Sequence, residues 1–238
     1  MSRSVVIDCF PDCVWRYQEG WAIVAVDVIR ATTTAVTAVL HGRRCIPVAS
    51  LAHAMEHAAC LHDPLLVGEL GGNMPFGFDL NNSPAELARR SDVDRPIVLL
   101  ATSGTPLIVN ARGADAVYLG CFRNYAAVAG YVTGRHDRIA IVGAGSRGEF
   151  REEDQMACAW ISERLIEAGY TSADSRTEKL VRCWSGAPAE ACLVSNSVRY
   201  LRRTGQMADL EFILTHVNDL NAVGLMRYGD VVLVPITD

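Results

Sequence analysis

An acid, an arginine and three consecutive threonines stand together where an apolar segment ends and a helical pattern begins. They are Asp27, Arg30 and Thr32 to Thr34, directly after the apolar residues 22–26. A helix N-terminus offers unpaired N–H groups to an anion, arginine binds phosphate or sulfonate oxygens, and aspartate binds hard metal ions. The stretch indicates either an anion site beside a cation site or a threonine N-cap next to a surface arginine.

A long glycine-rich loop follows the apolar segment 65–68. It spans residues 68–84 and carries two acids and an amide that could face a site, Glu69, Asp79 and Asn82. Long loops in compact domains are usually functional or disordered. Because Phe76, Phe78 and Leu80 can tether it, we expect an ordered loop that presents its acids to a site, with a plain connector as the alternative.

A short run of hydroxyl residues and glycine follows the apolar segment 97–100. In Thr102-Ser103-Gly104-Thr105, glycine lets the backbone approach an anion and the hydroxyl groups can donate to its oxygens. An ordinary helix start at Thr105, with Pro106 in the first turn, explains the same residues. The run therefore supports an anion site only together with other evidence.

The fourth polar loop matches G-x-G-x-x-G over residues 143–148, directly after an apolar segment. This is the dinucleotide-binding fingerprint, but the match is weak. Charged residues follow Gly148, and no clear strand ends in an acid about 20 residues later. Glu153 and Asp154 stand at the head of a helix, either as dipole partners or as further carboxylates in the site.

Composition points to a small ligand. Of the 238 residues, 50% are hydrophobic. The sequence has 22 Lys and Arg and 27 Asp and Glu, which gives a net charge of −5. Since the sequence has no basic run and no apolar run of transmembrane length, we expect no nucleic-acid partner and no membrane. The eight cysteines form no C-x-x-C pair. We expect a cytoplasmic protein with reduced cysteines, and base rates favour a homo-oligomer.

Short apolar strands alternate with helical patterns, which predicts an α/β fold: three α/β/α layers around a mostly parallel sheet. We expect one domain over residues 1–238, or two intimately packed α/β subdomains. Six βα units are too few for an eight-fold barrel. The expected strands are 4–8, 22–27, 44–49, 65–68, 96–101, 116–120, 138–142 and 230–235, the last being the only clear late strand. The expected helices are 32–41, 51–61, 83–90, 105–111, 124–132 and 152–168, with helical character over 187–204 and 207–217.

In a parallel sheet the carboxyl ends of the strands share one edge, so the four polar loops should open onto one crevice. Together they resemble the 2-phosphosulfolactate phosphatase family in order and spacing. The residues that carry the resemblance are Asp27 to Thr34, Gly68-Glu69, Gly77 to Leu80, Asn82-Ser83-Pro84, Thr102 to Thr105, Asn124 and Glu153-Asp154. Two departures change no charged group: Gly143-Ala144-Gly145 stands where the family commonly has Cys-Ala-Gly, and Asn81 where glycine is usual.

The resemblance implies an α/β fold of the family's own type and a Mg²⁺-dependent phosphatase. Its expected reaction removes phosphate from 2-phospho-3-sulfolactate to give sulfolactate, a step towards coenzyme M. The expected partner is therefore a small anionic phosphorylated substrate.

We hypothesise that carboxylates bind the metal or activate water while Arg30 and neighbouring donors hold the substrate. Ile29 stands where a haloacid-dehalogenase-type signature has its second acid, so we favour displacement without a covalent intermediate. The expected catalytic residues are Asp27, Arg30 and Glu69, and the expected metal ligands are Asp27, Glu69, Asp79 and Asp154. The expected substrate-binding residues are Thr33, Thr34, Asn82, Ser103, Gly104, Thr105 and Asn124.

Two other functions stay open at this point. A phosphatase of another small phosphorylated hydroxy acid would need only small changes in the pocket. A dinucleotide-binding protein that uses the loop Gly143 to Gly148 is the third alternative.

Overall fold

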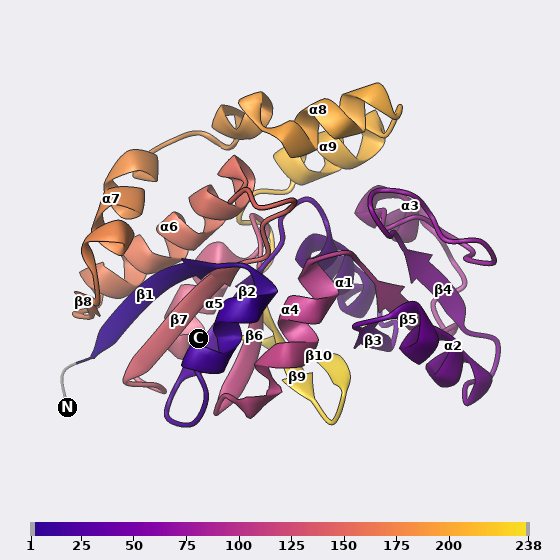
Figure 1. Cartoon of the computed structure of the whole chain (residues 1–238), viewed down its shortest axis with the longest axis horizontal. Helices are drawn as coiled ribbons and strands as arrows, with labels where there is room; N and C mark the ends of the chain where they lie inside the picture. The colour runs from indigo at the N-terminus through magenta and orange to yellow at the C-terminus, as the bar shows by residue number, and fades with distance from the viewer. Residues whose placement is uncertain (1–2, 237–238) are drawn as a thin grey trace.

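The computed structural model describes residues 3–236, which form one ten-stranded sheet with helices on both faces (Figure 1). The strands are β1 (Ser4–Cys9), β2 (Ala22–Val26), β3 (Cys45–Val48), β4 (Leu65–Gly68), β5 (Ile97–Leu100), β6 (Ala116–Gly120), β7 (Arg138–Gly143), β8 (Thr171–Ser172), β9 (Ala222–Arg227) and β10 (Asp230–Pro235). The α-helices are α1 (Ala31–Leu40), α2 (Leu51–Ala59), α3 (Pro84–Arg89), α4 (Gly104–Asn110), α5 (Tyr125–Val132), α6 (Glu152–Glu167), α7 (Ser175–Trp184), α8 (Asn196–Arg203) and α9 (Met207–Thr215). The described residues also include 3-10 turns at Pro11–Arg16, Ala111–Gly113 and Ala189–Val194.

The sheet consists of two parallel groups separated by an antiparallel hairpin. Its order is β4-β5-β3-β10-β9-β6-β2-β7-β1-β8. Strands β4, β5 and β3 are parallel to one another, as are β6, β2, β7, β1 and β8, while the hairpin of β9 and β10 pairs antiparallel to both groups. The α/β fold and the mostly parallel sheet expected from the sequence are therefore confirmed.

Strand alternation divides the core between the two faces of the sheet. In β2, Val24 and Val26 belong to the core cluster that includes residues of α5, α6, α8 and α9, whereas Ile23 and Ala25 belong to the cluster on the side of α1 and α4. Successive side chains of a strand point to opposite faces, so a strand buried on both faces reads as a continuous apolar run. This burial makes β2 and its neighbour β7 a rigid base for the loops that follow them.

The sequence missed parts of the C-terminal third. Residues 222–227 form β9, although 230–235 was expected to be the only clear late strand, and α7 had not been expected. The helical stretch expected over 187–204 divides into a 3-10 turn and α8, because Ser195 is extended and its side chain accepts from the N–H of Val198 as the N-cap. Among residues 3–236, no helix is long and apolar enough to cross a bilayer.

Candidate active site

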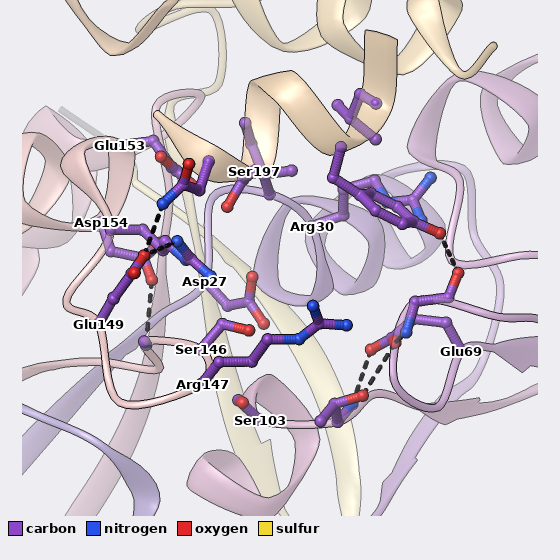
Figure 2. Close-up of a pocket in the computed structure, with 18 of the residues that line it drawn as sticks. Asp27, Arg30, Glu69, Ser103, Ser146, Arg147, Glu149, Glu153, Asp154 and Ser197 are labelled. Carbon is purple, nitrogen blue, oxygen red and sulfur yellow. Dashed lines mark hydrogen bonds and ion pairs between the residues drawn. The ribbon is translucent and has the colours of Figure 1, made fainter. Parts of the chain in front are cut away.

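A cavity of about 490 Å³ lies where the loops after β2, β4, β5 and β7 meet helix α8 (Figure 2). The two parallel groups run in opposite senses through the hairpin, but sheet twist of roughly 20–25° per strand accumulates between them. This twist turns the groups across one another, so loops from both groups line the same cavity. The predicted convergence of the four polar loops is correct, although one common parallel edge is not its cause.

Asp27 lies at the base of the cavity and is almost entirely buried, with 7% of its surface exposed. Thr32 orients the backbone at Asp27. The Thr32 hydroxyl accepts from the Asp27 N–H at 2.9 Å and donates to the Asp27 carbonyl oxygen at 2.8 Å. The carboxylate packs against α4, and a Cβ built on Gly104 would lie 2.1 Å from Asp27 Oδ2. Gly104 is therefore the residue type that lets α4 approach this carboxylate.

Three buried carboxyl groups gather at this end of the cavity: Asp27, Glu153 and Asp154. Burial, together with the nearby charges of Glu69 and Glu153, raises the pKa of Asp27 to about 7. Burial and then the charges of Asp27 and Glu153 raise the pKa of Asp154 well above its usual range, and burial raises the pKa of Glu153. The clustered negative charge needs either protons or a cation.

Asp154 also joins two loops of the site. Its Oδ1 accepts from the Val28 N–H at 2.8 Å and its Oδ2 from the Gly145 N–H at 3.3 Å, so it connects the loop after β2 to the loop after β7. Both contacts come from the first turn of α6. Asp154 thus holds the two loops together as well as adding charge to the cavity.

Glu69 connects the glycine-rich loop to the turn after β5. Its carboxylate accepts from the Gly72 N–H at 2.6 Å, from the Thr102 N–H at 2.7 Å and from the Thr102 hydroxyl at 2.9 Å. These bonds fix the opposite wall of the cavity (Figure 2). The expectation of an ordered loop over 68–84 agrees with this set of contacts.

Arg30 is held in a buried polar network rather than left free in the cavity. Its Nη1 donates to Asp209 Oδ2 at 2.6 Å and to Gln206, and its Nη2 donates to Asn81 Oδ1 at 3.2 Å. Both side chains of the Arg30–Asp209 pair are only 4% exposed. Arg30 still lines the cavity, with its orientation set by α9.

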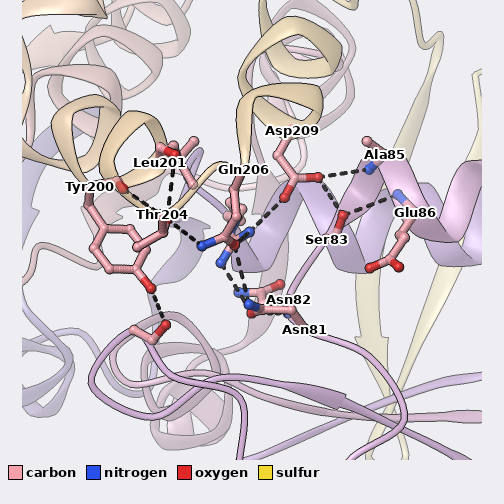
Figure 3. A network of polar contacts seen from close by, with 12 residues as sticks. Asn81, Asn82, Ser83, Ala85, Glu86, Tyr200, Leu201, Thr204, Gln206 and Asp209 are labelled. Carbon is pink, nitrogen blue, oxygen red and sulfur yellow. Dashed lines mark hydrogen bonds and ion pairs between the residues drawn. The ribbon is translucent and has the colours of Figure 1, made fainter.

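Asp209 connects the same network to α3 (Figure 3). Its Oδ1 accepts from the Ser83 hydroxyl at 2.5 Å and from the Ala85 N–H at 3.2 Å, while Ser83 caps α3 by accepting from the Glu86 N–H at 3.1 Å. The N-cap serine therefore has a second partner that is 126 residues away.

Five arginines line the cavity, and they differ in their partners. Arg30 and Arg151 form ion pairs with Asp209 and Glu149. Within residues 3–236, the other three have no carboxylate oxygen within 4.0 Å of their side-chain nitrogens, and these are Arg147, Arg199 and Arg203. Arg147 extends from the loop after β7 to a position between Asp27 and Glu69 (Figure 2).

The structure brings together some of the residues expected at the site and separates others. The cavity is lined by Asp27, Arg30, Glu69, Asn82, Ser103 and Asp154, and Gly104 packs against Asp27. Asn82 Oδ1 is buried there and has no hydrogen-bond partner among residues 3–236, which leaves it available to a ligand.

The remaining expected residues do not line the cavity. The Thr33 and Thr105 hydroxyls donate to the carbonyl oxygens of Val28 and Ala101, and the buried Thr34 hydroxyl has no partner in the described part of the chain. Asn124 accepts from the Cys121 N–H at 3.0 Å and donates to the Leu119 carbonyl oxygen at 3.0 Å, so its amide holds the turn between β6 and α5. Asp79 is exposed, and its Oδ2 accepts from the Leu66 N–H at 2.8 Å.

The carboxylate oxygens of the cavity fit a hard divalent cation whose coordination shell is completed by other ligands. Within residues 3–236, no three His, Cys, Asp or Glu side chains are placed so that they alone could hold a metal ion. The buried Glu153 Oε2 has no hydrogen-bond partner among the residues that the structure describes, and it belongs to the carboxylate cluster of Asp27 and Asp154. Mg²⁺ usually takes one or two carboxylates and fills its other positions with water and substrate oxygens, which suits this set.

The loop 143–148 does not present a helix N-terminus to a pyrophosphate. Helix α6 begins only at Glu152, and its first turn carries three acids, Glu152, Glu153 and Asp154. Negative charge at this helix end would repel phosphate rather than attract it. The geometry therefore favours a different use of this loop from the dinucleotide fingerprint.

Sequence reasoning missed Arg147, the α8 residues and Asp209. Arg147 had a usable signal, because it stands in a polar loop directly after a buried strand. Arg199, Arg203 and Asp209 had none, since they belong to C-terminal helices whose position over the cavity is set by tertiary packing.

Comparison with known proteins finds one family. The model of the family described as 2-phosphosulpholactate phosphatase matches residues 11–228. Three bacterial proteins named "Probable 2-phosphosulfolactate phosphatase" are similar over most of their length. The one from Deinococcus radiodurans is 33% identical over 211 residues, which is 87% of this chain and 86% of its own. The one from Symbiobacterium thermophilum is 32% identical over 223 residues, or 90% and 94% of the two chains. The one from Caldanaerobacter subterraneus is 29% identical over 213 residues, or 87% and 88%.

Proposed function

Because the chain belongs to the 2-phosphosulfolactate phosphatase family, a family of phosphoric monoester hydrolases, we propose that it hydrolyses 2-phospho-3-sulfolactate to sulfolactate and phosphate with Mg²⁺. The observation that carries this proposal is the charge distribution of the cavity. A buried cluster of carboxylates lies at one end, and the rest of the lining includes three guanidinium groups that have no carboxylate partner within residues 3–236. A metal-bound phosphate ester with further anionic groups is a ligand of matching charge.

Asp27 and Glu153 are the carboxylates that we expect to hold Mg²⁺, with Asp154 beside them. Bound there, the ion would neutralise charge on the phosphoryl oxygens, which is the main requirement for hydrolysis of a phosphate monoester. Glu69 already accepts three hydrogen bonds, from the Gly72 and Thr102 N–H groups and from the Thr102 hydroxyl, so we assign it to positioning of the cavity wall. Asp79 has no part in this proposal because it lies outside the cavity.

Arg147 and the polar groups near it are the expected phosphate donors. Its guanidinium group lies between the carboxylate cluster and the Glu69 wall, and Ser103 and Ser146 line the cavity beside it (Figure 2). A guanidinium group donates two parallel hydrogen bonds to phosphate and keeps its charge at all relevant pH values. Arg30, fixed by Asp209, adds positive charge at a set position. We favour direct attack by water, since Ile29 leaves no second acid for an aspartyl-phosphate mechanism.

A panel of phosphate esters tests this proposal. Phosphate release is measured from 2-phosphosulfolactate, 2-phospholactate and 3-phosphoglycerate, each with Mg²⁺ and with EDTA. We expect Mg²⁺-dependent release that is fastest from 2-phosphosulfolactate. A preference for another hydroxy-acid phosphate would assign a different substrate to the same site. Saturable NAD(H) binding without release from any ester would overturn the proposal.

A further inference from the structure

Two arginines on one face of α8 line the cavity. Arg199 and Arg203 are four residues apart, so they lie above one another on the helix surface. Like charges at this spacing destabilise a helix by roughly 0.2–0.5 kcal/mol. In the described part of the chain, neither guanidinium group has a carboxylate within 4.0 Å that would offset this cost. Ion pairing within the described residues therefore does not explain why both arginines stand on this face of the helix.

Helix α8 is nonetheless firmly placed over the cavity. Its own residues Val198 and Leu201 are completely buried in the core. The Tyr200 hydroxyl donates to the carbonyl oxygen of Gly72 in the glycine-rich loop (Figure 3). The Arg203 guanidinium group lies 5.9 Å from the centre of the Tyr200 ring. Arg199 Nη1 donates to Asn196 Oδ1 at 3.3 Å. The two charges are thus presented from an anchored element.

The helix also separates these arginines from the carboxylate cluster. Ser197, near the start of α8, lines the same end of the cavity as Glu153, whereas Arg203 is the last residue of the helix (Figure 2). At a rise of about 1.5 Å per residue, Arg203 lies roughly 9 Å further along the helix axis than Ser197. An anionic group near Asp27 and Glu153 would be repelled unless a metal ion accompanied it. A second anionic group on the same ligand is therefore favoured at the arginine end.

We propose that Arg199 and Arg203 form a second anion subsite, which binds the sulfonate of the substrate while its phosphate lies at the carboxylate end. This inference rests on the proposed function and deepens it, because it assigns substrate specificity to α8. Guanidinium groups suit a sulfonate, since both remain charged and several N–H groups can reach its three oxygens. Each arginine should contribute about 10- to 100-fold to the preference for a substrate with this group.

The test compares two substrates that differ in the sulfonate. The ratio of kcat/KM for 2-phosphosulfolactate to that for 2-phospholactate is measured for the wild-type protein and for the double variant Arg199→Met/Arg203→Met. We expect the ratio to fall at least 100-fold in the double variant. The control is Arg202→Met, because Arg202 is exposed on the same helix but does not line the cavity, and it should keep the wild-type ratio. An unchanged ratio in the double variant would overturn the subsite.

Binding of the product keeps the subsite testable if the proposed function fails. If the wild-type protein hydrolyses neither ester with Mg²⁺, the proposed function is wrong, and calorimetric titration with sulfolactate then tests the subsite alone. We expect the double variant to bind sulfolactate at least 30-fold more weakly than the wild-type and Arg202→Met proteins. Equal affinities in all three proteins would contradict the inference.

Discussion

At the scale of single residues, the contact between Asp27 and Gly104 sets the geometry of the cavity base. A methyl group at position 104 would lie 2.1 Å from Asp27 Oδ2, so either the carboxylate or α4 must move. Displacement of a catalytic group by about 1 Å can cost roughly 100-fold in rate. We therefore expect Gly104→Ala to lower kcat/KM for Mg²⁺-dependent phosphate release by about 100-fold, as measured by steady-state kinetics.

Gly130→Ala is the matched control for this substitution. Gly130 lies within α5, and a Cβ built on it meets no atom within 4 Å. Alanine should raise helix stability there by about 0.5–1 kcal/mol and leave kinetics unchanged. If Gly104→Ala were as active as Gly130→Ala, Asp27 would not need its observed position.

At the scale of elements, Asp209 connects α9 to the start of α1 through Arg30 and to the N-terminus of α3 through Ser83 and Ala85. Replacement of one partner leaves the other as a buried charge without compensation, which costs about 3–5 kcal/mol. We expect Asp209→Asn to lower the free energy of unfolding by about this amount in urea denaturation, and to lower kcat because Arg30 loses its orientation.

Asp219→Asn provides the comparison for Asp209→Asn. Asp219 pairs with the buried Arg123, with Nη2 to Oδ2 at 2.8 Å, but its own side chain is 30% exposed and neither residue lines the cavity. Its replacement should cost less stability and leave kcat nearly unchanged. Equal losses of kcat in the two variants would show that the Arg30 network has no special relation to the site.

Local sequence patterns correctly predicted the strands and helices that short stretches of sequence determine. The continuous apolar runs of β2 and β7 predicted buried parallel strands, and Ser83-Pro84 predicted the start of α3. Strand β9 was not predicted, because Gly224 interrupts its apolar pattern. Its pairing with β6 and β10 depends on strands that are distant in sequence or on the far side of a turn. Asn124 was expected to bind substrate, but its amide bonds the backbone of the turn between β6 and α5, because a polar residue after a strand suits either purpose.

At the scale of the whole molecule, the site depends on residues that are distant in sequence. Asp27, Glu69, Ser103 and Asp154 were found because polar loops after strands converge in α/β folds. The wall that α8 contributes could not be found in this way, since its place over the cavity depends on the buried contacts of Val198 and Leu201. The sequence therefore predicted which loops after the strands would meet at one cavity, and it missed the wall of that cavity that α8 contributes.

The buried carboxylates should give the metal-free protein a characteristic pH dependence. The pKa of Asp27 is about 7 in the folded protein and near 3.8 when unfolded, so the folded state holds a proton that the unfolded state has released. This contribution to stability is full below the unfolded pKa and is lost as the pH rises through about 7. Thermal melting in EDTA from pH 4 to 8 should therefore show Asp27→Asn gaining stability relative to the wild-type protein as pH rises. A difference between the two proteins that is constant with pH would contradict the assigned shift.

The central claim is that the Asp27 cavity is where phosphate esters are hydrolysed, and one measurement tests it most directly. Phosphate release from 2-phosphosulfolactate is followed with Mg²⁺ for the wild-type protein and for Asp27→Asn, which keeps the size of the side chain and removes its charge. We predict Mg²⁺-dependent turnover by the wild-type protein and a loss of at least about 100-fold in kcat for Asp27→Asn, with the fold intact by circular dichroism. Near-normal turnover by Asp27→Asn would contradict the account.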